Sequence, residues 1–412
     1  MKRLWDGGRR VGTDEPNLPS SEELFTAEVE TALRENPIVG SVTRGGDFSL
    51  LVGRDQGTHT LFLRNVFAET RDMAPAERAA RVQRFISVVR SPPEDELSFE
   101  AARGRLVPLL RHATVFHRID GGKLRVAIQR PFAPFLIECV GVDAEDSIGY
   151  LTESQLEKWN VSAEAAFRAA RETAAAAFAP GDIRPYGSER GFALWHVAKD
   201  DSYESSRLLV PGWLAGFASR VSGRPVAIVP ARSRVIVGGD GNEACLRFLI
   251  EAANREYLAS PRSITPALYT IGEGGAVVPL LLPPGHPLAG EVALGHVSLA
   301  ATEYKTQQDV LQAKLGEETF VATYRGFRKG ELVSSFTTWS EDVPSLLPEA
   351  AEIAIVPSGG DHFRVPWTTA LTVVGDGLRR EPGLDPPRWR TGRWPDAAAF
   401  AKLRAAAIPG ER

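Results

Sequence analysis

"VIVGGDGNEACLRF" (residues 235–248) joins an apolar run to a segment of helical spacing through three glycines. Residues 224–239, which include the start of this stretch, alternate around a polar turn at 231–233 and predict a hairpin of two strands. Downstream, residues 265–283 predict a second strand pair, in which Gly274 and Gly275 supply the positive φ of the turn. Because the strands continue as hairpins rather than as strand–helix–strand crossovers, we predict a mixed α+β fold with largely antiparallel sheets and packed helices.

The glycine-rich turn raises the question of a phosphate-binding site. Residues 239–244 fit the G-x-G-x-x-A pattern, in which backbone amides at a helix N-terminus bind a pyrophosphate. That pattern also requires a second parallel strand that ends in an acidic residue about 20 residues later, and the loop-like "EYLASPRSITP" fills that place instead. We therefore predict a turn in which Asp240 or Asn242 caps the helix, and we keep nucleotide binding at Gly238–Gly241 as a weaker alternative.

The N-terminal part of the chain shows the same mixture of periodicities. Apolar residues recur at helical spacing near its start, and glycine pairs then punctuate an alternating stretch that is typical of an antiparallel meander. The expected elements are a helix at 20–36, a meander at 38–67, helices at 74–90 and 97–112, and strands at 123–143 that are broken by prolines.

Composition divides the chain into two main domains. The first two α+β regions combine into one domain, and a stretch rich in proline and glycine predicts a linker before the rest. The expected segments are a flexible tail at 1–20, an N-terminal α+β region at 21–145, a central α+β region at 146–283, the linker at 284–300, and a C-terminal β-rich domain at 301–412 with a Pro-rich tail and a terminal helix.

A short repeated sequence suggests a duplicated structural unit. "AIVP" occurs at 227–230 and again at 354–357, and "VGGD" or "VVGD" follows each copy. A Trp near the end of a strand and a Leu-Leu pair precede each copy. We interpret this as a candidate repeat of a strand–helix–strand–strand unit, with chance recurrence as the alternative because the spacings differ.

Charge and cysteine usage exclude several classes of protein. The 412-residue chain has a formal net charge of −4, and because it has no basic surplus we expect no nucleic-acid partner. No run of about 18 apolar residues occurs, so we expect no membrane span, and no secretory signal is expected. Cys139 and Cys245 each lie within an apolar run, which predicts buried free thiols and a cytoplasmic location.

The densest polar cluster is "WHVAKDDSYESSRLL" (residues 195–209). Asp200 and Asp201 could hold a metal or act as acid and base, and Ser205 or Ser206 could be a nucleophile with His196 as its base. No G-x-S-x-G elbow surrounds either serine. We therefore favour a turn and a helix cap, in which Arg207 pairs with a nearby acid.

The histidines form no metal-binding motif, and we expect neither a bound metal nor a cofactor. His112 and His117 are five residues apart, which places them on different faces of a helix or strand, although with Asp120 they could form a ligand cluster on a bent loop. Asp361 and His362 are adjacent, and a hairpin turn explains them. Arginines and tryptophans interleave in the Pro-rich residues 378–394, where they could stack on bases or anchor a protein interface. We favour a segment that wraps over a domain surface.

Two stretches in the middle of the chain carry a family resemblance. "IECVGVDAEDSIGYLTESQLEKWNVSAEAAFRAA" and "DSYESSRLLVPGWL", with the strand "GRPVAIVPARSRVIVGG" beyond it, resemble the YtpQ-like bacterial family, a domain of unknown function numbered 1444. The resemblance covers roughly residues 20–283 and implies a mixed α+β domain without an established activity. The polar positions that it matches best are Asp201, Tyr203, Ser206 and Arg207.

Three functional hypotheses follow from the sequence. The first is a non-enzymatic protein-binding or regulatory protein, because no catalytic, metal or cofactor motif is found. The second is a hydrolase that uses the turn at Asp200–Arg207. The third and weakest is nucleotide binding at Gly238–Gly241.

Overall fold

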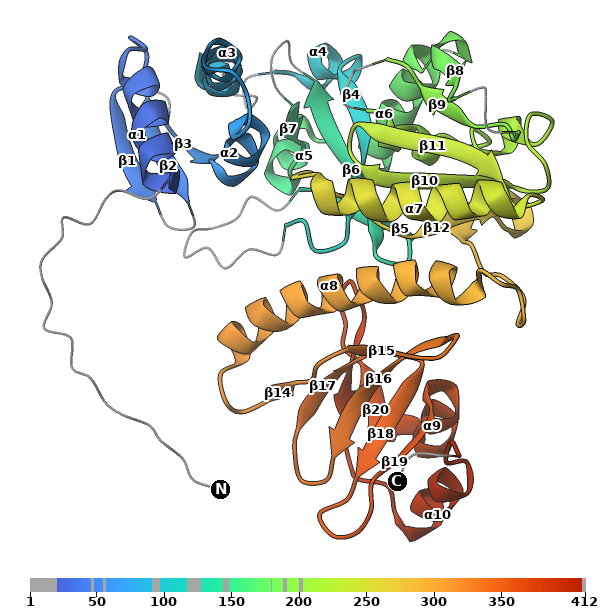
Figure 1. Ribbon diagram of the computed structural model, residues 1–412. Coiled ribbons are helices and arrows are strands. Elements are labelled where there is room, and N and C mark those ends of the chain that lie inside the picture. The colour runs from blue at the N-terminus through green and yellow to red at the C-terminus, as the bar shows by residue number, and fades with distance from the viewer. Residues whose placement is uncertain are drawn as a thin grey trace, which may run out of the picture. The chain divides into compact units, whose positions relative to one another are not determined.

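The computed structural model describes residues 21–45, 48–54, 57–90, 97–116, 127–143, 148–178, 180–187, 191–199 and 203–409, so the predicted tail at 1–20 lies outside the described residues. The chain forms two compact units, Met1–Pro93 and Glu94–Arg412. The predicted α+β class is confirmed, because helices accompany sheets whose neighbouring strands are mostly antiparallel (Figure 1). None of the helices in the described part combines the length and hydropathy that a membrane span needs.

The first unit is the predicted meander with helices packed on it. Phe25, Val29 and Leu33 are fully buried on one face of the first helix, which confirms their helical spacing. The elements are α1 (Ser21–Arg34), β1 (Ser41–Gly45), β2 (Ser49–Arg54), β3 (Gly57–Phe62), α2 (Arg64–Thr70) and α3 (Pro75–Ile86), and the strand order is β1-β2-β3.

The second unit begins with a sheet where a helix is expected at 97–112. The helix is only α4 (Phe99–Arg103), and β4 (Leu106–His112) follows it. The prediction is wrong because Gly104 ends the helix and the run after it contains Pro108 and is buried almost throughout, as in a central strand. The other elements are β5 (Gln129–Ala133), β6 (Leu136–Asp143), β7 (Ile148–Tyr150), α5 (Glu153–Trp159) and α6 (Ala163–Ala177).

A six-stranded antiparallel sheet follows, in the order β13-β12-β10-β11-β9-β8. The two predicted hairpins are both present, at 224–239 and 265–283. Helix α7 (Glu243–Ala259) packs its buried face, which includes Leu246 and Leu249, against one side of this sheet. The strands are β8 (Ile183–Pro185), β9 (Trp195–Val197), β10 (Pro225–Ala231), β11 (Arg234–Gly239), β12 (Leu268–Ile271) and β13 (Val277–Pro279).

The predicted linker at 284–300 is largely the first part of the long helix α8 (Ala289–Leu315). Its glycines permit close packing. A Cβ on Gly290 would lie 2.6 Å from the Glu331 carbonyl oxygen, and one on Gly295 would lie 2.9 Å from that of Pro266. The glycines are present because backbone from two other segments packs closely against the helix. The prediction of a linker at 284–300 is therefore wrong.

The remainder of the unit consists of two small sheets on which α8 lies (Figure 1). Their strand orders are β15-β16-β18-β19 and β14-β17-β21-β20. The elements are β14 (Phe320–Val321), β15 (Arg325–Lys329), β16 (Leu332–Ser340), β17 (Ser345–Pro348), β18 (Glu352–Val356), β19 (Phe363–Pro366), α9 (Trp367–Val374), β20 (Leu378–Arg380), β21 (Arg388–Thr391) and α10 (Ala397–Ala405).

The candidate repeat is not a structural duplication. The first "AIVP" lies on β10, between two antiparallel neighbours, whereas the second begins on β18, which pairs in parallel with β16. "VGGD" runs through the end of β11, whereas "VVGD" lies at the end of α9. The short sequences recur because buried strands share a composition, and the topology around them differs.

Candidate functional site

Of the segment that the sequence singles out at 200–207, the structure describes residues 203–207, and these lie in the interior between two sheets. Asp200 and Asp201 lie outside the described residues, while Tyr203, Ser206 and Arg207 are buried, with exposed fractions of 7%, 1% and 1%. The last two lie on the short helix η4 (Ser205–Leu209). Ser206 Oγ accepts a hydrogen bond from the Leu110 amide of β4 at 3.2 Å.

The contacts of this segment are structural. The Ser205 amide donates to the Arg232 carbonyl in the β10–β11 turn, so η4 connects two sheets. The Tyr203 hydroxyl donates to Asp143 Oδ1 at 2.6 Å. As predicted, Arg207 pairs with a nearby acid, because its Nη2 lies 3.5 Å from Asp182 Oδ2.

This geometry does not favour the hydrolase hypothesis. A serine nucleophile needs a base within hydrogen-bond reach and access for a substrate. In the described part of the chain no histidine hydrogen-bonds Ser205 or Ser206, and both serines are buried. The ring of His196 instead lies edge-on to Tyr186, with centroids 5.2 Å apart.

The glycine-rich turn is packed against its own chain. Asn242 caps α7 by accepting from the Cys245 amide at 3.0 Å, as one of the two predicted caps, and Asp240 accepts from the Arg224 amide. A Cβ on Gly239 would lie 2.1 Å from the Ser222 carbonyl oxygen. The backbone of Ser222 therefore fills the space beside these glycines, which leaves the nucleotide hypothesis without structural support.

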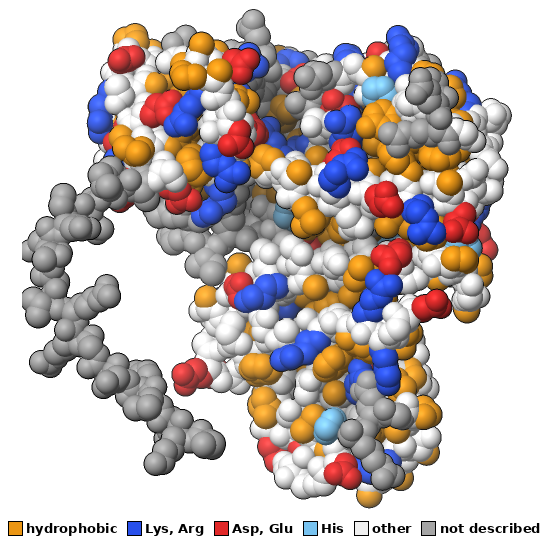
Figure 2. Space-filling view, in the orientation of Figure 1, with side chains coloured by type: hydrophobic (Ala, Val, Ile, Leu, Met, Phe, Trp, Pro, Cys, Tyr) orange, Lys and Arg blue, Asp and Glu red, His pale blue; other side chains and the backbone are white. Residues whose placement is uncertain are grey.

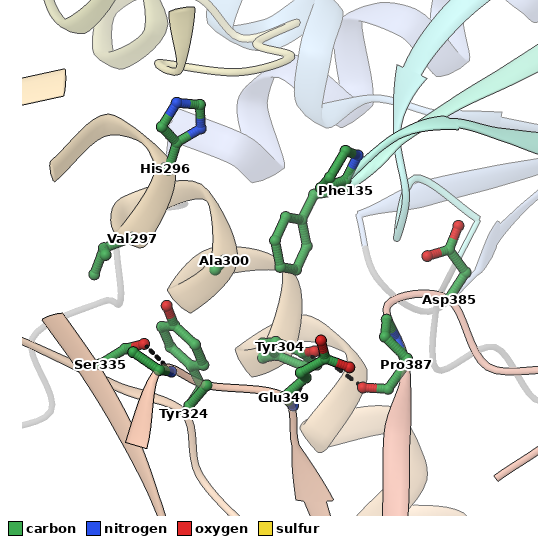
Figure 3. A pocket seen from close by; sticks show the side chains of 13 residues that line it. Phe135, His296, Val297, Ala300, Tyr304, Tyr324, Ser335, Glu349, Asp385 and Pro387 are labelled. Atoms are coloured by element: carbon green, nitrogen blue, oxygen red, sulfur yellow. Dashed lines mark hydrogen bonds between the residues drawn. The ribbon is translucent and has the colours of Figure 1, made fainter. Parts of the chain in front are cut away.

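A cavity of about 430 Å³, open on one side, lies beside α8. It is bounded by the β5–β6 turn, by one side of α8 and by the C-terminal sheets and loops (Figure 3). No sequence motif marked it, because its wall comes from segments that are far apart in the chain. The lining residues are Pro134, Phe135, His296, Val297, Ala300, Tyr304, Tyr324, Ser335, Glu349, Ala350, Ala351, Asp385 and Pro387.

Three aromatic rings dominate the wall of this cavity. Phe135, at a positive φ of 64° in the β5–β6 turn, meets Tyr304 edge-on with centroids 5.5 Å apart. Tyr304 stacks on Tyr324 at 5.3 Å with an interplanar angle of 24°. Burial raises the pKa of both tyrosines, so both phenols are neutral at physiological pH.

The polar groups at the cavity are few and mostly fixed. The Tyr304 hydroxyl donates to the Pro387 carbonyl at 2.9 Å and accepts from the Glu349 amide at 3.1 Å. Ser335 Oγ accepts from the Ala351 amide at 3.0 Å. Burial raises the pKa of Asp385, although the nearby Arg380 opposes the shift. The lining thus combines the hydrogen-bonded hydroxyl groups of Tyr304 and Ser335 with two acidic residues, Glu349 and Asp385.

Buried polar contacts of α8 hold the cavity in place. Glu303, 2% exposed, accepts from the Thr114 amide at 2.8 Å and lies 3.1 Å from His112 Nδ1, which fixes α8 to the end of β4. On the other side, Gln307 Nε2 donates to the Pro386 carbonyl at 2.7 Å. His112 therefore contacts α8, whereas His117 and Asp120 of the suggested ligand cluster lie outside the described residues.

A histidine in the cavity wall makes the stability of this unit depend on pH. His296 Nε2 lies 3.1 Å from the Leu280 carbonyl, and because a carbonyl only accepts, Nε2 carries the proton. Burial lowers the pKa of His296 below its ordinary value of 6.5. The unfolded chain therefore takes up a proton more readily than the folded one, and the contribution to stability is complete above about pH 6.5 and is lost as the pH falls toward the folded pKa.

We expect His296→Gln to reduce the loss of unfolding free energy between about pH 7.5 and about pH 5.5, because the variant has no imidazole to protonate. Urea denaturation at both pH values measures this loss. The control is His362→Gln, an exposed histidine in the same unit. Equal pH dependence in wild type and His296→Gln would contradict the prediction.

The other described residues provide few groups that could form a metal-binding or reactive site. They contain no group of three or more His, Cys, Asp and Glu side chains placed to hold a metal ion. Both cysteines are free and buried, as predicted. Basic and acidic side chains are interspersed over the face seen in Figure 2. Comparison with protein-family models, curated proteins and solved structures finds no match to the chain.

Proposed function

We propose that the protein is a non-enzymatic binding protein and that the cavity beside α8 holds a small organic molecule. The observation that carries this proposal is the cavity itself, because about 430 Å³ lined mainly by aromatic and apolar side chains, with a few fixed polar groups, is within the size range of ligand sites. The described candidate residues from the sequence, Tyr203, Ser206 and Arg207, are in contrast buried in internal contacts.

The lining of the cavity limits the class of ligand. It contains no lysine or arginine, while Glu349 and Asp385 contribute carboxyl groups. The aromatic faces of Phe135, Tyr304 and Tyr324 suit an apolar or ring-bearing molecule. A neutral or cationic ligand is therefore favoured over an anion, because the lining residues include two acids and no lysine or arginine.

Filling the cavity tests the proposal. Ala300 lines the cavity and is 3% exposed, so Ala300→Leu places a larger side chain in it. We expect a screen of small neutral, cationic and anionic ring compounds to find ligands that raise the melting temperature of the wild type, since ligand at 100 times its Kd stabilises by about 2.7 kcal/mol. Ala300→Leu should abolish this rise.

The matched control is Ala313→Leu, on the exposed side of the same helix, which should keep the response. If no compound stabilises the wild type, or if the same compounds stabilise Ala300→Leu equally, the proposed site is wrong.

Three expectations from the sequence stay predictions beside this proposal. A protein partner is tested by affinity purification of the full chain. A cytoplasmic location agrees with two free thiols. The relation to the YtpQ-like family, and with it the roles of Asp201, Tyr203, Ser206 and Arg207, stays a prediction from the motifs.

A further inference from the structure

Two guanidinium groups of the second unit lie close to the β4–β6–β7 sheet. Arg111, on β4, is 3% exposed, and Arg232, in the β10–β11 turn, is half-buried. Arg111 Nε donates to the Tyr150 hydroxyl at 2.8 Å, and its Nη1 donates to the Leu110 carbonyl at 2.8 Å. Among the residues that the structure describes, neither guanidinium forms an ion pair.

The backbone brings these two arginines together. Ser206 Oγ binds the amide of Leu110, which precedes Arg111, while the adjacent Ser205 amide binds the carbonyl of Arg232. Burial and, to a smaller extent, the positive charge of Arg111 lower the pKa of Arg232 to about 10. Burial alone would raise the pKa of Tyr150, but the two arginines outweigh this effect and the pKa is lowered. The three groups therefore share one positive environment.

Two carboxylates of the same sheet are engaged elsewhere. Glu138 and Cys139 are adjacent on β6, so their side chains lie on opposite faces of the sheet. The carboxylate oxygens of Glu138 lie 2.8 Å from Arg130 and 2.7 Å from Arg171. Asp143 Oδ1 accepts from the Tyr203 hydroxyl at 2.6 Å. Neither acid neutralises the pair.

We propose that Arg111, Arg232 and Tyr150 form a binding site for a small oxyanion, the phosphate or the carboxylate group of a small molecule. Buried charges in proteins are normally paired, and guanidinium groups bind phosphate and carboxylate through parallel hydrogen bonds. The Tyr150 hydroxyl accepts from Arg111, so its own proton can be donated to the anion. Arg232 is the less buried of the two arginines. This site is independent of the cavity beside α8, whose lining is acidic.

Calorimetric titration of the full chain at constant ionic strength tests the site, with inorganic phosphate in one arm and acetate in the other. We expect at least one anion to bind the wild type and the affinity to fall about tenfold or more in Arg232→Gln, which lacks the charged donor. Tighter binding of phosphate assigns a phosphate ligand, and tighter binding of acetate a carboxylate. The control is Arg255→Gln on α7, whose side chain is 62% exposed and which should bind like the wild type.

Arg111→Gln should lose binding as well, and its circular dichroism shows whether it folds; Arg232→Gln decides the question if it does not. The proposal is overturned if neither anion binds, or if Arg232→Gln and Arg255→Gln bind anions as the wild type does.

Discussion

Replacing Arg388 with alanine is expected to lower the free energy of unfolding of the Glu94–Arg412 unit by roughly 3–5 kcal/mol. Arg388 begins β21 and is fully buried. Alanine would leave several buried acceptors without a donor, which costs more than the loss of any single hydrogen bond. The acceptors of its guanidinium are Gln307 Oε1 at 2.6 Å and the carbonyls of Ala322, Tyr304 and Leu346 at 2.8, 3.0 and 3.1 Å.

Arg388 also ties α8 to the strands beneath it. Because Tyr304 and Gln307 lie on α8, their loss of contact with Arg388 would loosen the wall of the cavity. The matched control is Arg390→Ala, two residues along β21, whose side chain is 43% exposed and pairs with Glu381. This exposed pair should contribute no more than about 1 kcal/mol.

Urea denaturation of both variants measures the difference. Equal stability of Arg388→Ala and Arg390→Ala would show that the buried guanidinium does not hold α8 in place.

Gly239→Ala is expected to destabilise the same unit by about 3 kcal/mol or more. The new Cβ would lie 2.1 Å from the Ser222 carbonyl oxygen and 2.9 Å from the Ser222 amide nitrogen, and both are backbone atoms that cannot rotate away. The strain would separate the end of β11 from the loop at 222–224. A loss of stability of this size is expected if the turn at Gly239 packs closely against Ser222.

The control for this prediction is Gly216→Ala, where a Cβ would meet nothing within 4 Å and where φ is negative. That substitution should change stability by no more than about 0.5 kcal/mol. Thermal and urea unfolding compare the two. A Gly239→Ala protein of wild-type stability that loses a nucleotide-induced rise in melting temperature would instead support a phosphate site.

Local patterns are sufficient to predict the hairpin at 224–239 and the helix that follows it. The strands at 224–239 are fixed by alternation and by a short turn, and α7 is fixed by the Asn242 cap and by apolar residues that repeat along one face. These signals lie within a few residues of the elements that they define, so the sequence alone predicts them.

The parts that sequence reasoning missed depend on distant contacts. The glycines of α8 indicate a linker by composition, but they are required because Glu331 and Pro266 approach the helix closely. In the same way, Ser206 and Arg207 have the residue types of a reactive site, yet β4 and Asp182 bind them in the interior. The cavity is assembled from hairpin, helix and loop, and no single segment carries its pattern.

A crystal structure of the full chain with the most stabilising compound from the screen tests the central claim most directly. We predict that the compound lies in the cavity beside α8, in contact with the rings of Phe135, Tyr304 and Tyr324. An empty cavity, with the compound bound at another surface, would contradict the account.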